Sequence, residues 1–217
     1  MKHLILILAL ALTACGGGSS ETTQITSPKA VISAPISNIV AFVGDSAFQM
    51  WDITQYDKDP TLNFGVSGDT TVQMLARFSD VLAAGPGVVV IMGGGNDLVR
   101  AGAVNTESIA AMAKMATDAG VRVILCAVNP LIESPVVINL RNHYPGQHLY
   151  NPNIEALNDA LLELAEANGY LYADFYDAML DNGQLDPSLY ADGLHPNATG
   201  YAKMWAVVQP LIEEDLR

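Results

Sequence analysis

The alternation of short apolar runs with helical segments is the feature that most constrains the fold. The first run, Ile39–Val43, is β-branched and aromatic with no polar face, which predicts a buried strand. Further strands are predicted at Thr61–Phe64, Val88–Met92, Val121–Val128 and Tyr170–Phe175. Because strands that alternate with helices require a parallel sheet covered on both faces, we expect a flavodoxin-like, three-layer α/β/α fold with a five-stranded parallel sheet.

Helices are predicted between these runs. After the second run, Asp69 or Thr70 is a candidate N-cap, and the apolar residues at helical spacing are Val72, Leu75, Ala76 and Phe78. Further helices are expected within Ala47–Tyr56, over Thr106–Ala119 with Asn105 or Thr106 as N-cap and Gly120 as the stop, and over Asn197–Leu211.

The segment Asn129–Tyr150 is predicted to be a loop that borders the functional site. It contains three prolines, and a connection of this length in a compact domain is usually functional or mobile. Asn151 is then the predicted N-cap of a helix, with Pro152 at its first position and Gly169 as the stop. We expect Asp181–Pro196 to be irregular.

The start of the chain has the composition of an export signal. Met1-Lys2-His3 is positively charged and Leu4–Leu12 is apolar. The apolar stretch is too short to span a bilayer, which takes about 20 residues. Leu12-Thr13-Ala14-Cys15 resembles the lipobox of bacterial lipoproteins, which implies cleavage before Cys15 and acylation of that cysteine. An ordinary soluble export signal with an incidental cysteine is the alternative.

This resemblance also implies a domain organisation and a location. We expect a signal peptide at residues 1–14, a lipidated cysteine and flexible tether at 15–37, and a single folded domain at 38–217. The tether is rich in Gly, Ser, Thr and Pro. Gly16, rather than Asp, follows Cys15, which favours the outer membrane of the bacterial envelope, facing the periplasm or the surface. The membrane partner would be held through several acyl chains on Cys15.

The charge of the chain excludes two classes of partner. A formal net charge of −13 at pH 7 argues against nucleic acid, whose phosphates need a basic face, and against electrostatic attraction to anionic lipid. Cys126 lies in an apolar run of the folded part, so we expect a buried thiol and no intrachain disulfide. The sequence leaves the oligomeric state open.

Polar residues follow four of the predicted strands. They are Asp45-Ser46 after the first strand, Gly68-Asp69 after the second, Asn96-Asp97 after the third, and Asp192 with His195 after the fifth. The carboxyl ends of parallel strands share one edge of a sheet, where open α/β folds bind their ligands. Residues far apart in the sequence are therefore expected to meet in one cleft.

The types of these residues suit acyl transfer. A serine hydroxyl such as that of Ser46 is a poor nucleophile until a base takes its proton. His195 is the best-placed base, because Asp192 lies three residues before it and can orient its imidazole. The amides of Ser46 and Gly68 and the side chain of Asn96 could donate to an oxyanion. Taken singly, each cluster could also be only a turn, a helix cap or a glycine loop.

Four blocks of sequence together resemble a known family. Gly44-Asp45-Ser46, Gly68, Gly94-Gly95-Asn96-Asp97 and Asp192-Gly193-Leu194-His195-Pro196 are similar, in this order, to the blocks of the SGNH hydrolases, the GDSL esterase and lipase family. The likeness covers essentially Ile39–Leu211. The flanking text of Gly65–Thr70 and His195–Tyr201 is similar to the platelet-activating-factor acetylhydrolase-like and lysophospholipase-like branch.

The resemblance implies a role for each matching residue. Ser46 would be the nucleophile, His195 the base and Asp192 its orienting partner, with Ser46, Gly68 and Asn96 as the oxyanion hole. Ala47 stands where the family name has leucine, which puts only the fine shape of the pocket in doubt. Asp45 and Asp97 also match motif positions, and we interpret them as structural residues that hold the loops by hydrogen bonds.

Other motifs fail on inspection. Phe48 stands where a Gly-x-Ser-x-Gly nucleophile elbow needs its second glycine. The glycines at 93–95 lack the residues of a nucleotide-binding loop. His143 and His148 with Glu133 do not have the spacing of a metal site, and we expect no metal and no cofactor.

We therefore expect a serine esterase that acts on small-molecule esters with small acyl groups through an acyl-enzyme. The alternatives are a lysophospholipase- or thioesterase-type activity, a carbohydrate acetylesterase, or a surface lipoprotein that uses the fold as a non-catalytic binding module. The sequence does not choose among substrates, because loops build the pocket.

Overall fold

The structure is a computed structural model that describes residues 37–55, 60–101, 104–144 and 150–213. All of them lie in the second of the two units into which the chain divides, Pro35–Arg217. The predicted signal peptide, Cys15 and His148 lie outside the described residues. Within the described part of the chain, no helix is both long and apolar enough to cross a membrane.

A five-stranded parallel sheet forms the centre of the domain. Its strands are β1 (Val40–Gly44), β2 (Thr61–Gly65), β3 (Val88–Ile91), β4 (Arg122–Cys126) and β5 (Leu171–Ala173). They lie in the order β2-β1-β3-β4-β5, which is the flavodoxin-like order. The predicted fold class is confirmed, and each predicted strand is found within a few residues of its expected bounds.

Helices lie on both faces of the sheet. They are α1 (Ser46–Gln49), α2 (Thr71–Ala76), α3 (Phe78–Ala83), α4 (Gly95–Ala101), α5 (Glu107–Asp118), α6 (Pro135–His143), α7 (Asn151–Asn168), α8 (Phe175–Ala178) and α9 (Ala198–Glu213). Short 3₁₀ turns occur at η1 (Ile53–Gln55) and η2 (Pro187–Leu189), and a small antiparallel pair is formed by β6 (Leu180–Asp181) and β7 (Gln184–Leu185).

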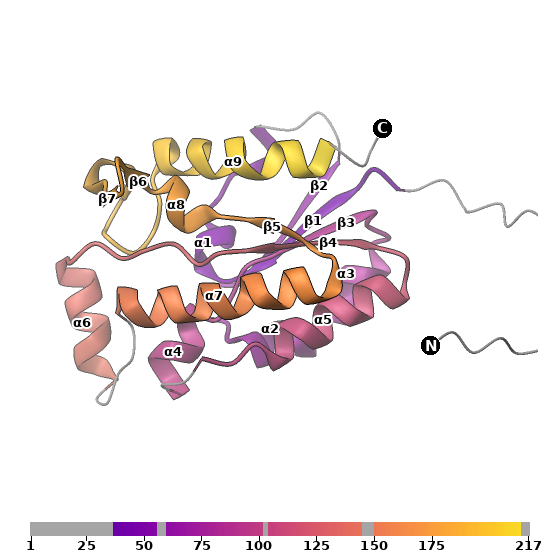
Figure 1. Cartoon of the computed structure of the whole chain (residues 1–217), viewed down its shortest axis with the longest axis horizontal. Coiled ribbons are helices and arrows are strands. Elements are labelled where there is room, and N and C mark those ends of the chain that lie inside the picture. Colours follow the sequence, from indigo (N-terminus) through magenta and orange to yellow (C-terminus); the bar gives the residue numbers. More distant parts are fainter. Residues whose placement is uncertain (1–36, 56–59, 102–103, 145–149, 214–217) are drawn as a thin grey trace, which may run out of the picture. The chain divides into compact units, whose positions relative to one another are not determined.

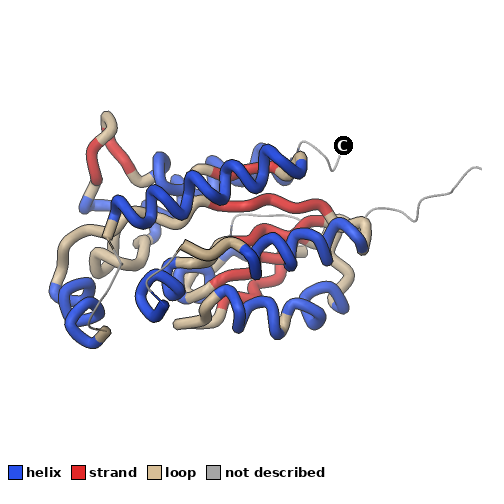
Figure 2. The backbone as a smooth tube through the Cα atoms, turned by 60° about the horizontal axis from the view of Figure 1, so that its bottom comes forward, coloured by secondary structure: helices blue, strands red, loops and turns tan. Residues whose placement is uncertain are grey.

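Alternate strand residues point to two separate cores, as the pleat of a strand requires. One core, with Val43, Ile91 and Leu125, packs against α2, α3, α5 and α7. The other, with Phe42, Val90 and Cys126, packs against α1, α8 and α9. Figure 1 shows α8 and α9 on one side of the sheet and α2, α5 and α7 on the other, and Figure 2 shows the strands between the two helix layers. Cys126 is a free, fully buried cysteine, as predicted.

The segment predicted as one long loop instead contains a helix, α6. Ser134 caps this helix by accepting a hydrogen bond from Val137 N at 3.2 Å, and Pro135 occupies the first turn. A Ser-Pro pair of this kind is a helix start, because proline has no N–H to leave unpaired in the first turn. The prolines therefore mark a helix boundary here as well as a loop.

Asn151 is not the N-cap of α7, which is Tyr150. The side chain of Asn151 instead accepts from Leu131 N at 2.7 Å and donates to Leu131 O at 3.0 Å. This pair of bonds ties the start of α7 to the segment after β4. The predicted stop is confirmed, since Gly169 has a left-handed conformation with φ of 70°.

The helix after β2 also differs from the prediction in its buried face. Thr70 is its N-cap, with Gln73 completing a capping box. Val72, one of the apolar residues at helical spacing, is 59% exposed, whereas Thr71 and Met74 are fully buried. The helix stops and restarts at Arg77, so α2 and α3 follow two separate helical registers rather than one.

Candidate active site

Ser46 lies on a tight turn at the carboxyl end of β1. A Cβ on Gly44, the last residue of β1, would lie 2.8 Å from the Phe48 ring, so only glycine fits there. Asp45 caps α1, since its Oδ1 accepts a hydrogen bond from Ala47 N at 3.0 Å. Ser46 is thus the first residue of α1, between the ends of β2 and β3. Open α/β sheets bind ligands at this point, where the strand order reverses.

The C-terminal helix supports this turn from behind. The Tyr201 hydroxyl of α9 donates to Ala47 O at 2.8 Å. The Tyr201 ring stacks on Trp51, with 5.2 Å between the ring centroids, and Trp51 packs edge-on against Phe42 of β1. The turn that carries Ser46 therefore rests on an aromatic cluster drawn from both ends of the domain.

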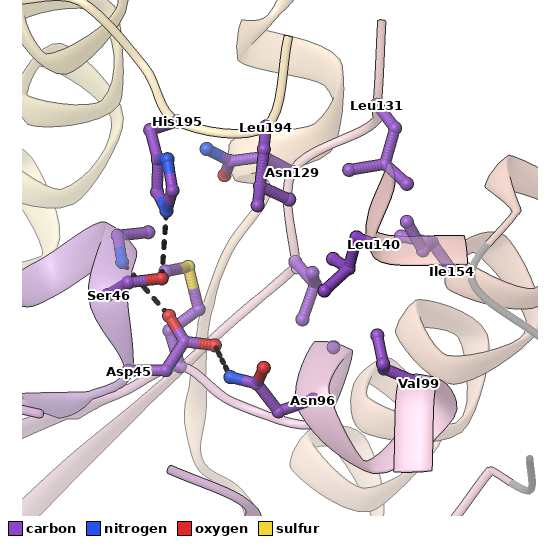
Figure 3. Close-up of a pocket in the computed structure, with 14 residues that line it drawn as sticks. Asp45, Ser46, Asn96, Val99, Asn129, Leu131, Leu140, Ile154, Leu194 and His195 are labelled. Carbon is purple, nitrogen blue, oxygen red and sulfur yellow. Dashed lines mark hydrogen bonds between the residues drawn. The ribbon is translucent and has the colours of Figure 1, made fainter. Parts of the chain in front are cut away.

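Ser46, His195 and Asp192 form a chain of hydrogen bonds. Ser46 Oγ lies 2.9 Å from His195 Nε2, and His195 Nδ1 lies 2.8 Å from Asp192 Oδ2 (Figure 3 shows the first of these contacts). The remaining oxygen of Asp192 accepts from the backbone N–H groups of Leu194 and His195 at 2.9 and 2.8 Å. The carboxylate is thus fixed by its own turn and directed at the imidazole.

The electrostatics of Asp192 favour its ionised form. Burial opposes ionisation, but the hydrogen bonds from the His195 side chain and from the two backbone amides outweigh it and lower the pKa of the Asp192 carboxyl. A charged carboxylate in this position holds the neutral imidazole with its proton on Nδ1. Nε2 of His195 is then left free to accept a proton from Ser46.

Gly193 gives this turn its shape. It has a φ of +87°, and a Cβ there would lie 2.6 Å from Ile132 O. Ile132 N donates to Gly193 O at 2.9 Å, which joins the turn to the segment after β4. A glycine is needed for both the left-handed conformation and the close approach.

Gly68 and Asn96, the other predicted oxyanion residues, line one cavity with Ser46. Gly68 lies in the loop after β2 and has a φ of +80°. Asn96 lies in the first turn of α4, and its Nδ2 donates to Asp69 O at 3.0 Å and to Asp45 Oδ2 at 3.3 Å (Figure 3 shows the second of these contacts). The amide of Asn96 is therefore held in a fixed orientation beside the serine turn.

Asp45 and Asp97 both hold loops by hydrogen bonds, as we interpreted them from the sequence. Asp97 accepts from Thr71 N at 2.9 Å and from Thr71 Oγ1 at 2.7 Å, which joins α4 to the start of α2. Burial raises the pKa of Asp45 to about 6, although the hydrogen bond from Ala47 N and the nearby His195 act in the opposite direction.

Arg77 is a further part of this network that the sequence analysis missed. Its Nε donates to Asp69 Oδ2 at 2.8 Å, and its Nη2 donates to Gly44 O at 3.0 Å. Arg77 therefore ties the end of β1 to the loop that carries Gly68. No motif marks this residue in the sequence, because it lies at the break between α2 and α3.

Two cavities open beside Ser46, Asn96 and His195. The inner cavity is mostly apolar and is lined by Met92, Val99, Val128, Leu131, Leu140, Ile154 and Leu194, with the polar Asn129 among them (Figure 3). The outer cavity shares Val99, Leu140 and Leu194 and adds Ser67, Gly68, Arg100 and Tyr144. The segment 129–150 thus borders the site, through residues before and within α6 and through Tyr144.

Among the described residues, no cluster of three or more His, Cys, Asp and Glu side chains is arranged to hold a metal ion. His143 ends α6, and its ring packs edge-on against that of Tyr144 at 4.9 Å.

The fold is thus an α/β protein of the flavodoxin-like class, with a hydrogen-bonded serine, histidine and carboxylate at the carboxyl edge of its sheet. The GDSL-like lipase/acylhydrolase family matches residues 42–203, and the chain belongs to this family. It is therefore a carboxylic ester hydrolase, as the sequence predicted.

Solved structures agree with this assignment. A protein from Bacteroides fragilis assigned as an acylhydrolase is 28% identical, with a TM-score of 0.71 over 83% of this chain and 88% of its own. A GDSL-like lipase from Bacteroides thetaiotaomicron is 30% identical, with a TM-score of 0.68 over 82% and 89%. An acetylxylan esterase from Geobacillus stearothermophilus, 18% identical with a TM-score of 0.60 over 81% and 94%, has the same fold. The comparison with curated proteins gave no significant match.

Proposed function

We propose that the chain hydrolyses esters with small acyl groups through a Ser46–His195–Asp192 triad. The observation that carries this proposal is the continuous hydrogen-bonded chain from Ser46 Oγ to Asp192, with contacts of 2.9 and 2.8 Å. The first distance is within the range at which a base takes a proton from a nucleophile, and the second is that of a hydrogen bond that orients the base.

The reaction begins when Ser46 Oγ attacks the ester carbonyl carbon and His195 Nε2 takes the hydroxyl proton. The carbonyl oxygen becomes an oxyanion, for which the amides of Ser46 and Gly68 and the Asn96 side chain are the candidate donors. When the C–O bond to the alcohol breaks, the imidazolium gives its proton to the departing oxygen. The acyl group then remains on Ser46, and Asp192 has stabilised the imidazolium without taking a proton itself.

The second half of the reaction repeats these steps with water. His195 takes a proton from a water molecule, which attacks the acyl carbon, and the same proton returns to Ser46 Oγ as the carboxylic acid leaves. A protonated imidazole cannot act as a base in either half. The turnover rate is therefore expected to fall on acidification, and a rate that stayed flat from pH 4 to 9 would contradict the role of His195.

The inner cavity supports the preference for small acyl groups. Its far wall is made by Leu131 and Ile154, which are 5% and 0% exposed and belong to the domain core. An acyl chain that enters from Ser46 meets these packed side chains, and long chains would have to displace them.

The test is a panel of aryl esters with acyl chains from acetyl to dodecanoyl, run beside Ser46→Ala. We expect the highest kcat/KM for the shortest chains and loss of activity in the variant. Equal rates for the two proteins would support a non-catalytic binding module instead. The panel should include acetylated xylo-oligosaccharides, because an acetylxylan esterase shares the fold, and a lysophospholipid.

We also propose that Cys15 is acylated and holds the enzyme at the bacterial envelope, in the outer membrane, after removal of residues 1–14. The support is the lipobox-like Leu12-Thr13-Ala14-Cys15 and the Gly- and Ser-rich segment that follows it. In cells fed an alkyne-labelled fatty acid, the wild type should carry the label in the outer-membrane fraction. Cys15→Ser should carry none, and a labelled variant would disprove the assignment.

A further inference from the structure

We propose, building on the proposed esterase function, that Arg100 binds an anionic group on the alcohol half of the substrate, such as a phosphate or a carboxylate. Arg100 lines the outer cavity together with Ser46, Gly68 and His195. Its guanidinium lies close to Gly68, since a Cβ built on that glycine would be 3.3 Å from Arg100 Nη2. A positive charge thus stands beside the proposed oxyanion loop.

A comparison of the two arginines near this loop separates their roles. Arg77 is satisfied within the protein, since it pairs with the Asp69 carboxylate at 2.8 Å and donates to Gly44 O at 3.0 Å. Arg100 instead donates from Nη1 to a neutral group, Gln73 Oε1, at 3.4 Å. That contact is long for a hydrogen bond from a guanidinium.

Among the described residues, no carboxylate pairs with Arg100, so its charge is available to a ligand. The described carboxylates near the site have other partners. Asp192 contacts His195, and Asp97 accepts from Thr71 N and Thr71 Oγ1. Asp45 accepts from Ala47 N and from Asn96 Nδ2. Arg100 is exposed and lines the outer cavity. A guanidinium is the group best suited to a phosphate or carboxylate, because its fork of N–H groups matches two oxygens at once.

The two cavities differ in a way that assigns this anion to the alcohol. The acyl group stays on Ser46 after the first step, whereas the alcohol must leave and be replaced by water. The inner cavity is apolar and bounded by core residues, which suits the retained acyl group. The outer cavity carries Ser67 and Arg100, which suits a polar alcohol on its way to solvent.

The test compares three acetyl esters at low ionic strength: 1-acetylglycerol, 1-acetylglycerol 3-phosphate and O-acetylglycerate. We expect the wild type to have a higher kcat/KM for one or both anionic esters. Arg100→Gln should lower that value about tenfold and leave the neutral ester within about twofold, since one exposed charge-assisted contact is lost. The stronger of the two anionic substrates identifies the group as phosphate or carboxylate.

Two controls make the result specific. Arg100→Lys should fall between the wild type and Arg100→Gln, because it keeps the charge but not the fork. Lys114→Gln removes the same charge from α5, where Lys114 pairs with Asp118 outside both cavities. This variant should leave kcat/KM unchanged for all three esters.

The outcomes also separate this proposal from the esterase function. If 1-acetylglycerol is cleaved in a Ser46-dependent way but the wild type shows no preference for the anionic esters, the role of Arg100 is wrong and the esterase stands. If Arg100→Gln lowers kcat/KM equally for all three esters, Arg100 acts on the acyl centre that they share, and the proposed anion site is again wrong. If none of the esters is cleaved and Ser46→Ala equals the wild type, the esterase function itself fails.

Discussion

Replacing Arg77 by methionine should destabilise the domain through one buried carboxylate. Arg77 and Asp69 are 23% and 12% exposed, so the Asp69 charge has little water to replace its partner. Breaking a buried pair by removing one partner costs about 3–5 kcal/mol, and the partial exposure of Arg77 reduces this to about 2–3 kcal/mol. The substitution also removes the bond to Gly44 O.

Urea unfolding followed by circular dichroism measures the free energy of unfolding, and a temperature scan measures the midpoint of thermal unfolding. We expect the midpoint of thermal unfolding to fall by roughly 5–10 °C in Arg77→Met, given the size of the domain. With Asp69→Asn already in place, the same substitution should cost about 1 kcal/mol less, because no charge is then stranded. A free energy of unfolding for Arg77→Met within about 0.5 kcal/mol of the wild type would refute the reasoning, as would identical costs in the two backgrounds.

Three further outcomes follow from the site. Asp192→Asn should lower kcat by about 10²–10⁴ while the circular dichroism spectrum stays native. The amide oxygen can still accept from the backbone of the turn, but the side chain has no charge to stabilise the imidazolium. An unchanged kcat would remove Asp192 from the triad. Gly193→Ala should lower activity at least about tenfold through the collision with Ile132 O, whereas Gly183→Ala, with a similar φ of +76° but open space, should leave activity unchanged. The pKa of Asp45 is about 6 in the folded protein and 3.8 in the unfolded chain, so the folded state holds the proton more tightly. The free energy of unfolding of the wild type should therefore fall relative to that of Asp45→Asn as pH rises from about 4 to 6. The loss should reach up to about 3 kcal/mol and then level off. Stability curves that run parallel over that range would contradict the raised pKa.

The sheet could be predicted from the sequence because several of its strands are short, continuous apolar runs. Runs such as Val88–Met92 are buried on both faces, and composition alone then identifies them. The convergence of Ser46 and His195 at one edge follows from the topology, and the two side chains are in fact in contact. Their roles in catalysis stay predictions.

What the sequence missed are the long-range polar contacts and the loop helices. Asn151 has the residue type of an N-cap, but its side chain forms hydrogen bonds with Leu131, 20 residues away in the sequence. Sequence rules that consider only neighbouring residues cannot predict this partner. Arg77 and Arg100 are unremarkable helix residues until the fold brings them to the same loop. The predicted spacing placed Val72 and Phe78 on one helix, but the helix is interrupted at Arg77. The two residues therefore belong to different helices, and Val72 is exposed while Phe78 is buried.

The bond from Tyr201 to Ala47 O makes the turn that carries Ser46 dependent on α9. A ribosome must therefore finish α9 before this turn has its support, and His195 is synthesised shortly before that helix. A nascent or clipped chain that ends before His195 would contain Ser46 without its hydrogen-bond partner and without the support of α9. If Ser46 and His195 act as we propose, this architecture can hydrolyse esters only after both ends of the domain have been synthesised and have folded together.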